Sequence, residues 1–136
     1  MSIINPQSQD FRPPLSRIKG LGSAHEGAQH WIGQRISAIA LLPLGLFILG
    51  WIKIYGGGTY SSTINSLSNP WISGLVLLFI TAASYHGALG IQVVIEDYVP
   101  ATGWRQWFLI KTKLTMIILP ILSLCFLMKI MILGMR

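Results

Sequence analysis

Residues 71–95 have the sequence WISGLVLLFITAASYHGALGIQVVI, in which no side chain carries a formal charge. A transmembrane helix needs roughly 20 predominantly apolar residues, so this stretch is long enough to cross a bilayer. It contains one imidazole, that of His86. Because a polar side chain within a membrane is costly, it usually has a dedicated partner. The stretch therefore predicts a membrane-spanning helix whose histidine has a function.

Two further apolar stretches, about 31–55 and 114–133, are also long enough to span a membrane. We therefore expect an all-α fold, an integral membrane bundle of three transmembrane helices within residues 31–136. A polar N-terminal segment, residues 1–30, precedes this domain. The connector over residues 56–69 is rich in Gly, Ser and Asn and has no apolar periodicity, which predicts a loop.

The composition also indicates a membrane protein. The 136 residues are 52% hydrophobic and only 10% charged, whereas a soluble domain carries roughly 25% charged residues. The single cysteine, Cys125, excludes a disulfide framework and an all-cysteine metal site formed by this chain alone. Residues 1–30 contain no apolar leader, so we expect the first hydrophobic helix to direct insertion, in the simplest case into a bacterial inner membrane.

Basic residues are distributed unevenly about the three spans. Seven lie before or at the start of the first span, or between the second and third, and three lie on the opposite side. The first group is Arg12, Arg17, Lys19, Arg35, Arg105, Lys111 and Lys113, and the second is Lys53, Lys129 and Arg136. Since cytoplasmic segments carry the excess of Lys and Arg, we expect the N-terminus in the cytoplasm. Membrane orientation then explains the net charge of +6 without nucleic-acid binding.

Small residues surround His86 on the predicted helix. Positions three and four residues away share its face, and these are Ala82, Ala83, Leu89 and Gly90. Three of the four are small, which leaves a shallow slot for a flat macrocycle, and neutral imidazole is a good iron ligand. For a lone histidine, a hydrogen bond to a tightly packed neighbouring helix is the more common explanation. The slot by itself leaves both interpretations open.

A haem with two histidine ligands needs a second imidazole at the same depth. His25 and His30 precede the first span, whereas His86 lies about nine residues, or ~13 Å of helix rise, inside Ile95. Neither of the first two shares that depth. If haem is bound through two histidines, the second must come from another polypeptide.

Three further polar residues lie at the predicted cytoplasmic boundary. Asp97 follows His86 by eleven residues, which on a helix returns to within about 20° of the same face. The Tyr98 phenol can donate a hydrogen bond to a carbonyl, and the Arg35 guanidinium can pair with carboxylates such as haem propionates. Taken singly, these residues are also typical of a helix end, an aromatic belt and a positive-inside anchor.

Together these residues closely resemble the D-type hydrophobic membrane-anchor subunit of succinate dehydrogenase (respiratory complex II). That family has a histidine in the second helix followed, after ten residues, by Asp-Tyr, and His86, Asp97 and Tyr98 match it in type and spacing. At the start of the first helix, Arg35 and His30 match as well, although no role follows for His30.

The resemblance, which covers about residues 23–133, implies a role for each matching residue. His86 would be an axial ligand of b-type haem (haem b), with the other histidine on a C-type cytochrome b anchor subunit. Tyr98 would hydrogen-bond a carbonyl oxygen of ubiquinone, and Asp97 would support that site. Arg35 would contact a haem propionate.

The resemblance also implies a place in the respiratory chain and the tricarboxylic acid cycle. The chain would hold a flavoprotein subunit, which carries FAD, and an iron–sulfur subunit at the membrane, build part of the ubiquinone site, and have no catalytic activity alone. Residues 1–22 have no counterpart that gives them a role.

Two alternatives stay open from the sequence. A fumarate reductase anchor would use the same chemistry in the opposite direction, and a non-redox membrane assembly or scaffold protein would need neither haem nor quinone. A transporter is disfavoured, because no acidic residue lies at mid-membrane in the predicted spans.

Overall fold

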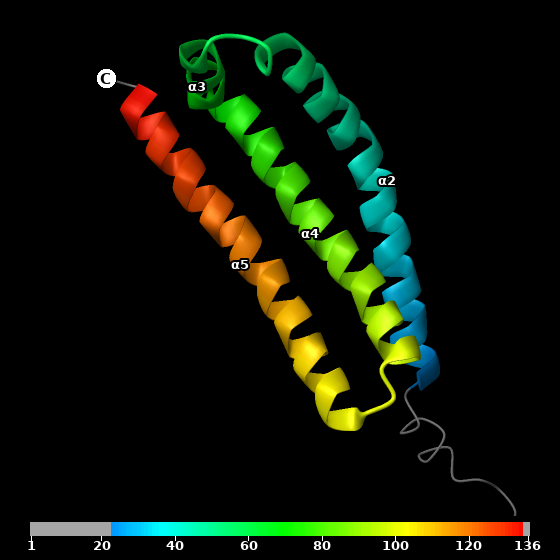
Figure 1. Cartoon of the computed structure of the whole chain (residues 1–136). Coiled ribbons are helices and arrows are strands. Elements are labelled where there is room, and N and C mark those ends of the chain that lie inside the picture. Colours follow the sequence, from blue (N-terminus) through cyan, green and yellow to red (C-terminus); the bar gives the residue numbers. More distant parts are fainter. Residues whose placement is uncertain (1–22, 135–136) are drawn as a thin grey trace, which may run out of the picture. The chain divides into compact units, whose positions relative to one another are not determined.

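The structure is a computed structural model and describes residues 23–134, with side chains from residue 27 onward. Almost all of this range is helical, in four helices (Figure 1): α2 (Ser23–Tyr55), α3 (Tyr60–Ser68), α4 (Pro70–Tyr98) and α5 (Thr102–Gly134). Three of them are apolar and long enough to span a membrane, over Gly27–Tyr55, Pro70–Tyr98 and Thr102–Gly134. The prediction of an all-α membrane protein with three spans is thus confirmed over the described residues.

The predicted sidedness stays a prediction. Four of the basic residues on which it depends, and the whole of residues 1–22, lie outside the described residues: Arg12, Arg17, Lys19 and Arg136.

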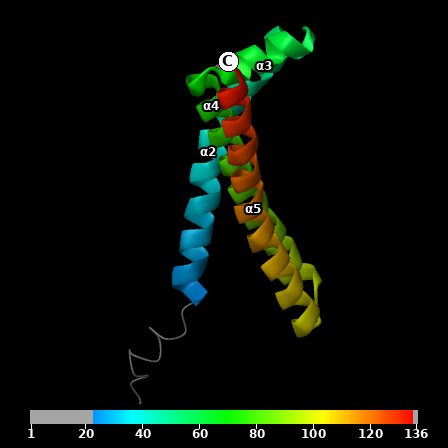
Figure 2. The ribbon, with the colours of Figure 1, turned by 90° about the vertical axis from the view of Figure 1, so that its left-hand side faces the viewer.

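The chain divides into a first unit that ends at Ile32 and a second that begins at Gly33. Within the second unit, α4 runs between α2 and α5 (Figure 1). The short helix α3 lies across the end at which α2 finishes and α4 begins (Figure 2). The last residue of α5 packs closely there, because a Cβ added to Gly134 would lie only 2.6 Å from the Cβ of Ser68.

Local sequence signals define both ends of α4. At its start, the Asn69 side-chain oxygen accepts a hydrogen bond from the Trp71 backbone N–H at 2.9 Å, which caps the helix. At its end, Val99 has an extended backbone, with φ −103° and ψ 100°. This is the conformation that the following Pro100 favours. The proline therefore ends α4 at Tyr98.

The connector between the first two spans contains a helix, α3, so the predicted loop is wrong over residues 60–68. Ser and Thr weaken isolated helices because their side chains compete for backbone hydrogen bonds. Here they bond neighbouring elements as well. Trp51 Nε1 donates to the buried Ser66 Oγ at 3.1 Å, and Thr63 Oγ1 donates to the Tyr55 carbonyl at 2.9 Å. These tertiary contacts, which local composition does not reveal, stabilise α3.

The helix α5 begins at Thr102, well before the predicted third span. Its first turns carry an aromatic and basic cluster. The rings of Trp104 and Trp107 lie 5.9 Å apart, Trp107 also packs edge to face on Phe108 at 5.3 Å, and Lys111 Nζ lies 4.1 Å from the Trp107 ring centroid. Aromatic and basic side chains of this kind suit a membrane–water boundary.

Candidate functional site

The His86 ring is held by a residue of α2. Its Nδ1 lies 3.0 Å from the Oγ of Ser37, which is only 6% exposed. The Ser37 hydroxyl also lies 2.8 Å from the Gly33 carbonyl oxygen and 3.0 Å from that of Gln34. The His86 side chain is half-buried, and no hydrogen bond joins its Nε2 to any described residue. Nδ1 is thus held by a hydrogen bond to Ser37, whereas Nε2 has no hydrogen-bond partner among the described residues.

The predicted slot beside His86 is partly filled by α2. The Cβ position of Gly33 lies 3.6 Å from Leu89 Cδ1, and the Cβ position of Gly90 lies 3.9 Å from Gln34 Nε2. Small residues on both helices therefore serve close helix packing, as they commonly do in membranes. On this side of His86 the packing interpretation holds.

An open hollow also lies between α2 and α4, and Ser37 is one of its lining residues. Its volume is about 420 Å³, within the range typical of ligand sites. Three residues of α2 and four of α4 line it: Gly33, Ile36, Ser37, Leu78, Thr81, Ala82 and Tyr85. His86 is not among these lining residues. Its own chemistry, a half-buried imidazole whose Nε2 has no hydrogen-bond partner among the described residues, fits a haem that is ligated in part by this chain.

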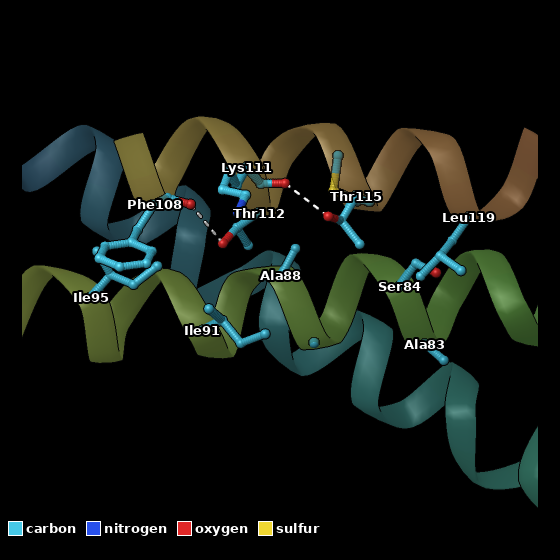
Figure 3. Close-up of a pocket in the computed structure, with 12 residues that line it drawn as sticks. Ala83, Ser84, Ala88, Ile91, Ile95, Phe108, Lys111, Thr112, Thr115 and Leu119 are labelled. Carbon is cyan, nitrogen blue, oxygen red and sulfur yellow. Dashed lines mark hydrogen bonds between the residues drawn. The ribbon is translucent and has the colours of Figure 1, made fainter. Parts of the chain in front are cut away.

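In addition to this hollow, a groove lies between α4 and α5 (Figure 3), with a volume of about 540 Å³. Ala88 and other small or apolar residues form its α4 wall. On α5, the Thr112 hydroxyl donates to the Phe108 carbonyl and the Thr115 hydroxyl to the Lys111 carbonyl, each at 2.9 Å. Because these hydroxyls are satisfied by their own helix, the groove presents a mainly apolar surface.

Asp97 and Tyr98 are the last two residues of α4. Since the helix is continuous from His86 onward, Asp97 lies about 16 Å further along it and near the same face. Both side chains are exposed, Tyr98 to 79%. One turn earlier, Gln92 donates a hydrogen bond to Glu96 at 2.8 Å. A pocket that encloses the Tyr98 phenol must therefore be completed by groups outside the described residues.

The two remaining predicted residues lie on α2. Arg35 is exposed and precedes Ser37 by two residues, which places it about 200° around the helix from the face that contacts His86. Its predicted contact with a propionate stays a prediction. His30 is half-buried, and its Nε2 is buried without a hydrogen-bond partner in the described part of the chain.

Ser37 is the site residue that the sequence analysis missed. It is 49 positions from His86, and no spacing rule connects positions on two different helices. The available signal was a hydroxyl within the apolar run that follows Arg35. Polar side chains in transmembrane helices commonly hydrogen-bond a neighbouring helix.

Comparison with known proteins gives a consistent family. Residues 9–128 match the family model of the succinate dehydrogenase/fumarate reductase transmembrane subunit. The chain is similar to the succinate dehydrogenase hydrophobic membrane anchor subunit of Rickettsia bellii, with 35% identity over 105 residues, 77% of this chain and 84% of that protein.

Two relatives from other organisms are similar over shorter regions. The subunit of the same name from Paracoccus denitrificans is 29% identical over 85 residues, 62% of this chain and 66% of that protein. The succinate dehydrogenase membrane anchor subunit of Reclinomonas americana is 36% identical over 76 residues, 54% of this chain and 63% of that protein. No solved structure matches the chain.

Proposed function

Because this chain belongs to the family of succinate dehydrogenase and fumarate reductase transmembrane subunits, we propose that it is the hydrophobic membrane-anchor subunit of a succinate:ubiquinone oxidoreductase. The relatives described above are named as succinate dehydrogenase subunits, which favours succinate oxidation over fumarate reduction. The chain spans a bacterial inner membrane three times, with its N-terminus in the cytoplasm. There it holds the flavoprotein and iron–sulfur subunits, has a C-type cytochrome b anchor subunit beside it, and is not catalytic alone.

His86 would supply one imidazole ligand to the iron of a b-type haem that this chain shares with the C-type anchor subunit. The arrangement of this ring is the observation that carries the proposal, since Nδ1 is bonded to Ser37 at 3.0 Å while Nε2 has no partner among the described residues. Haem, when bound, supplies a one-electron redox centre within the membrane. Arg35 pairs with one of its propionates at the cytoplasmic boundary.

Tyr98 donates a hydrogen bond from its phenol to a carbonyl oxygen of ubiquinone, and Asp97 supports the same site. The high exposure of Tyr98 in this chain supports a site shared between subunits. The walls of the groove between α4 and α5, together with the C-terminal end of α4, contribute apolar surface for a lipid-soluble substrate. The soluble subunits close the pocket from the aqueous side.

The haem role is tested on the complex purified through a tag on this chain. In His86→Ala, the b-type band of the reduced-minus-oxidised spectrum disappears while all four subunits still co-purify. An unchanged band in the assembled variant would remove the ligand role. A wild-type complex with neither a b-type band nor quinone reduction would identify a scaffold instead.

The quinone role is tested by a matched pair of tyrosine variants. Tyr98→Phe removes one hydrogen bond of ~1 kcal/mol, so ubiquinone reduction falls about fivefold or more, while dye-linked succinate oxidation is retained. Tyr60→Phe, at an exposed tyrosine of α3 outside the candidate site, leaves both activities unchanged. Equal loss of both activities in Tyr98→Phe would indicate misassembly, and undiminished ubiquinone reduction in the assembled variant would contradict the proposed contact.

A further inference from the structure

The contact between Ser37 and His86 has a direction, which follows from the neighbours of the serine hydroxyl. Two backbone carbonyl oxygens, those of Gly33 and Gln34, lie within hydrogen-bond distance of Ser37 Oγ, at 2.8 and 3.0 Å. Carbonyl oxygens only accept hydrogen bonds, and a hydroxyl has a single proton to donate together with two lone pairs. The hydroxyl proton therefore points toward these carbonyls.

The lone pairs of Ser37 Oγ then face His86 Nδ1, 3.0 Å away. The opposite arrangement, with the serine donating to Nδ1, would turn its lone pairs toward two carbonyl oxygens and give repulsive contacts. A neutral imidazole carries its proton on one nitrogen only. The proton is thus on Nδ1, where it is donated to Ser37, and Nε2 has the free lone pair.

We propose that Ser37 is a positioning residue that selects the Nδ1-protonated tautomer of His86 and so presents Nε2 for iron ligation. This inference rests on the proposed haem role of His86 and adds a second residue of the same chain to that site. Ser37 touches neither the haem nor the quinone in this assignment and acts through the imidazole.

The buried, apolar surroundings of Ser37 strengthen its preference for the Nδ1-protonated tautomer of His86. Ser37 is 6% exposed, so water does not compete for its hydroxyl. Both residues lie within the apolar spans, where a polar group without a partner is costly. A histidine that ligates a metal generally donates its other ring N–H to an acceptor, which fixes the tautomer and the ring orientation and raises the basicity of the ligating nitrogen.

The test uses the purified complex with Ser37→Ala, which deletes the acceptor, and Ser37→Thr, which retains a hydroxyl. Ser84→Ala is the matched control, because Ser84 lies on α4 two residues from His86 and donates to its own helix at the Ile80 carbonyl, at 2.7 Å. The measurements are the haem-to-protein ratio, the position of the reduced b-type band and the midpoint potential of the haem.

Ser37→Ala is expected to weaken haem retention by about tenfold or more, the range typical for loss of such a partner. The haem that remains should have a midpoint potential shifted to more positive values, because a less basic imidazole stabilises ferric iron less. Ser37→Thr should restore both properties toward wild type, and Ser84→Ala should change neither. A merely structural role for Ser37 would reduce assembly without moving the potential of the assembled complex.

The two proposals fail in different ways. If His86→Ala removes the b-type band but Ser37→Ala leaves haem content and potential at wild-type values, the positioning role of Ser37 is wrong and the haem role of His86 stands. If His86→Ala leaves the band unchanged, the haem role is wrong and the inference falls with it. A potential shift in Ser37→Ala that Ser37→Thr does not reverse would likewise overturn the tautomer assignment.

Discussion

Replacing Gly33 by alanine should destabilise the packing of α2 against α4. The added Cβ would lie 2.7 Å from Tyr85 Oη, about 0.7 Å inside the 3.4 Å at which ordinary contact begins, and 3.6 Å from Leu89 Cδ1. Overpacking of this kind costs ~1–3 kcal/mol. Alanine is the better helix former by about 1 kcal/mol, which offsets part of that cost. We expect a net destabilisation of about 1 kcal/mol.

The same geometry predicts a specific rescue. Tyr85→Phe removes the one atom that the new Cβ would overlap, and the next atom of that ring, Cζ, already lies at an ordinary 3.6 Å. In the phenylalanine background, Gly33→Ala should therefore be neutral or stabilising by up to about 1 kcal/mol. The interaction energy of the cycle is then about 1–2 kcal/mol, within the range found for residues in contact.

The assay is heat-induced dissociation of the full chain from its complex in mild detergent, compared across the two single variants and the double variant. Gly90→Ala is the matched control, because its Cβ would meet only Gln34 Nε2, at 3.9 Å, and its midpoint should not fall. Equal losses for Gly33→Ala in the tyrosine and phenylalanine backgrounds would refute the argument, since the overlap with Oη would then not be the cause.

Two further predictions test the N-terminal cap of α4 and the orientation of the chain in the membrane. Asn69→Ala removes the side-chain oxygen that accepts from the Trp71 backbone N–H at 2.9 Å, and it should cost ~0.5–2 kcal/mol of stability in the same assay, whereas Asn69→Asp should cost little. In a Cys125→Ala background, a membrane-impermeant maleimide added to spheroplasts should label Asn65→Cys but not Gln106→Cys, and the reverse pattern would contradict a cytoplasmic N-terminus.

The long helices could be predicted because their signals are local. A run without charge over residues 71–95 is sufficient for a span, and Pro70 and Pro100 mark the two ends of α4. The helix α3 was missed because Ser and Thr, taken singly, indicate a loop. Its apolar residues, Ile64 and Leu67, share one face but are too few to make a clear period.

The candidate site was predictable in part, for the same reason. His86 and Tyr98 share one helix, so their spacing alone fixes their relative register. The bond from Ser37 to His86 joins two helices and depends on how α2 packs against α4, which no local pattern specifies. The filling of the slot by Gln34 beside Gly90 was hidden for the same reason.

The residues buried within the described chain explain what specifies the fold. Only six are buried, and half of them are serines: Leu44, Ile95, Leu127, Ser37, Ser66 and Ser73. Apolar surfaces have little preference for one another over lipid in a bilayer, so polar contacts and close packing must select the helix pairs. Each buried serine does join two helices, with the partners His86 for Ser37, the Trp51 indole for Ser66 and the Leu67 carbonyl for Ser73.

Each of these three serine contacts links two helices, but the three partners differ in the polar atoms that remain free to bond another group. An indole N–H has no second polar atom, and a backbone carbonyl keeps only an acceptor. An imidazole held at one nitrogen keeps a second nitrogen of defined protonation, here directed away from the only described partner of the ring. The contact that pairs α2 with α4 therefore also orients a potential metal ligand. A variant that retains the helix pairing but abolishes the acceptor at residue 37 separates these two roles.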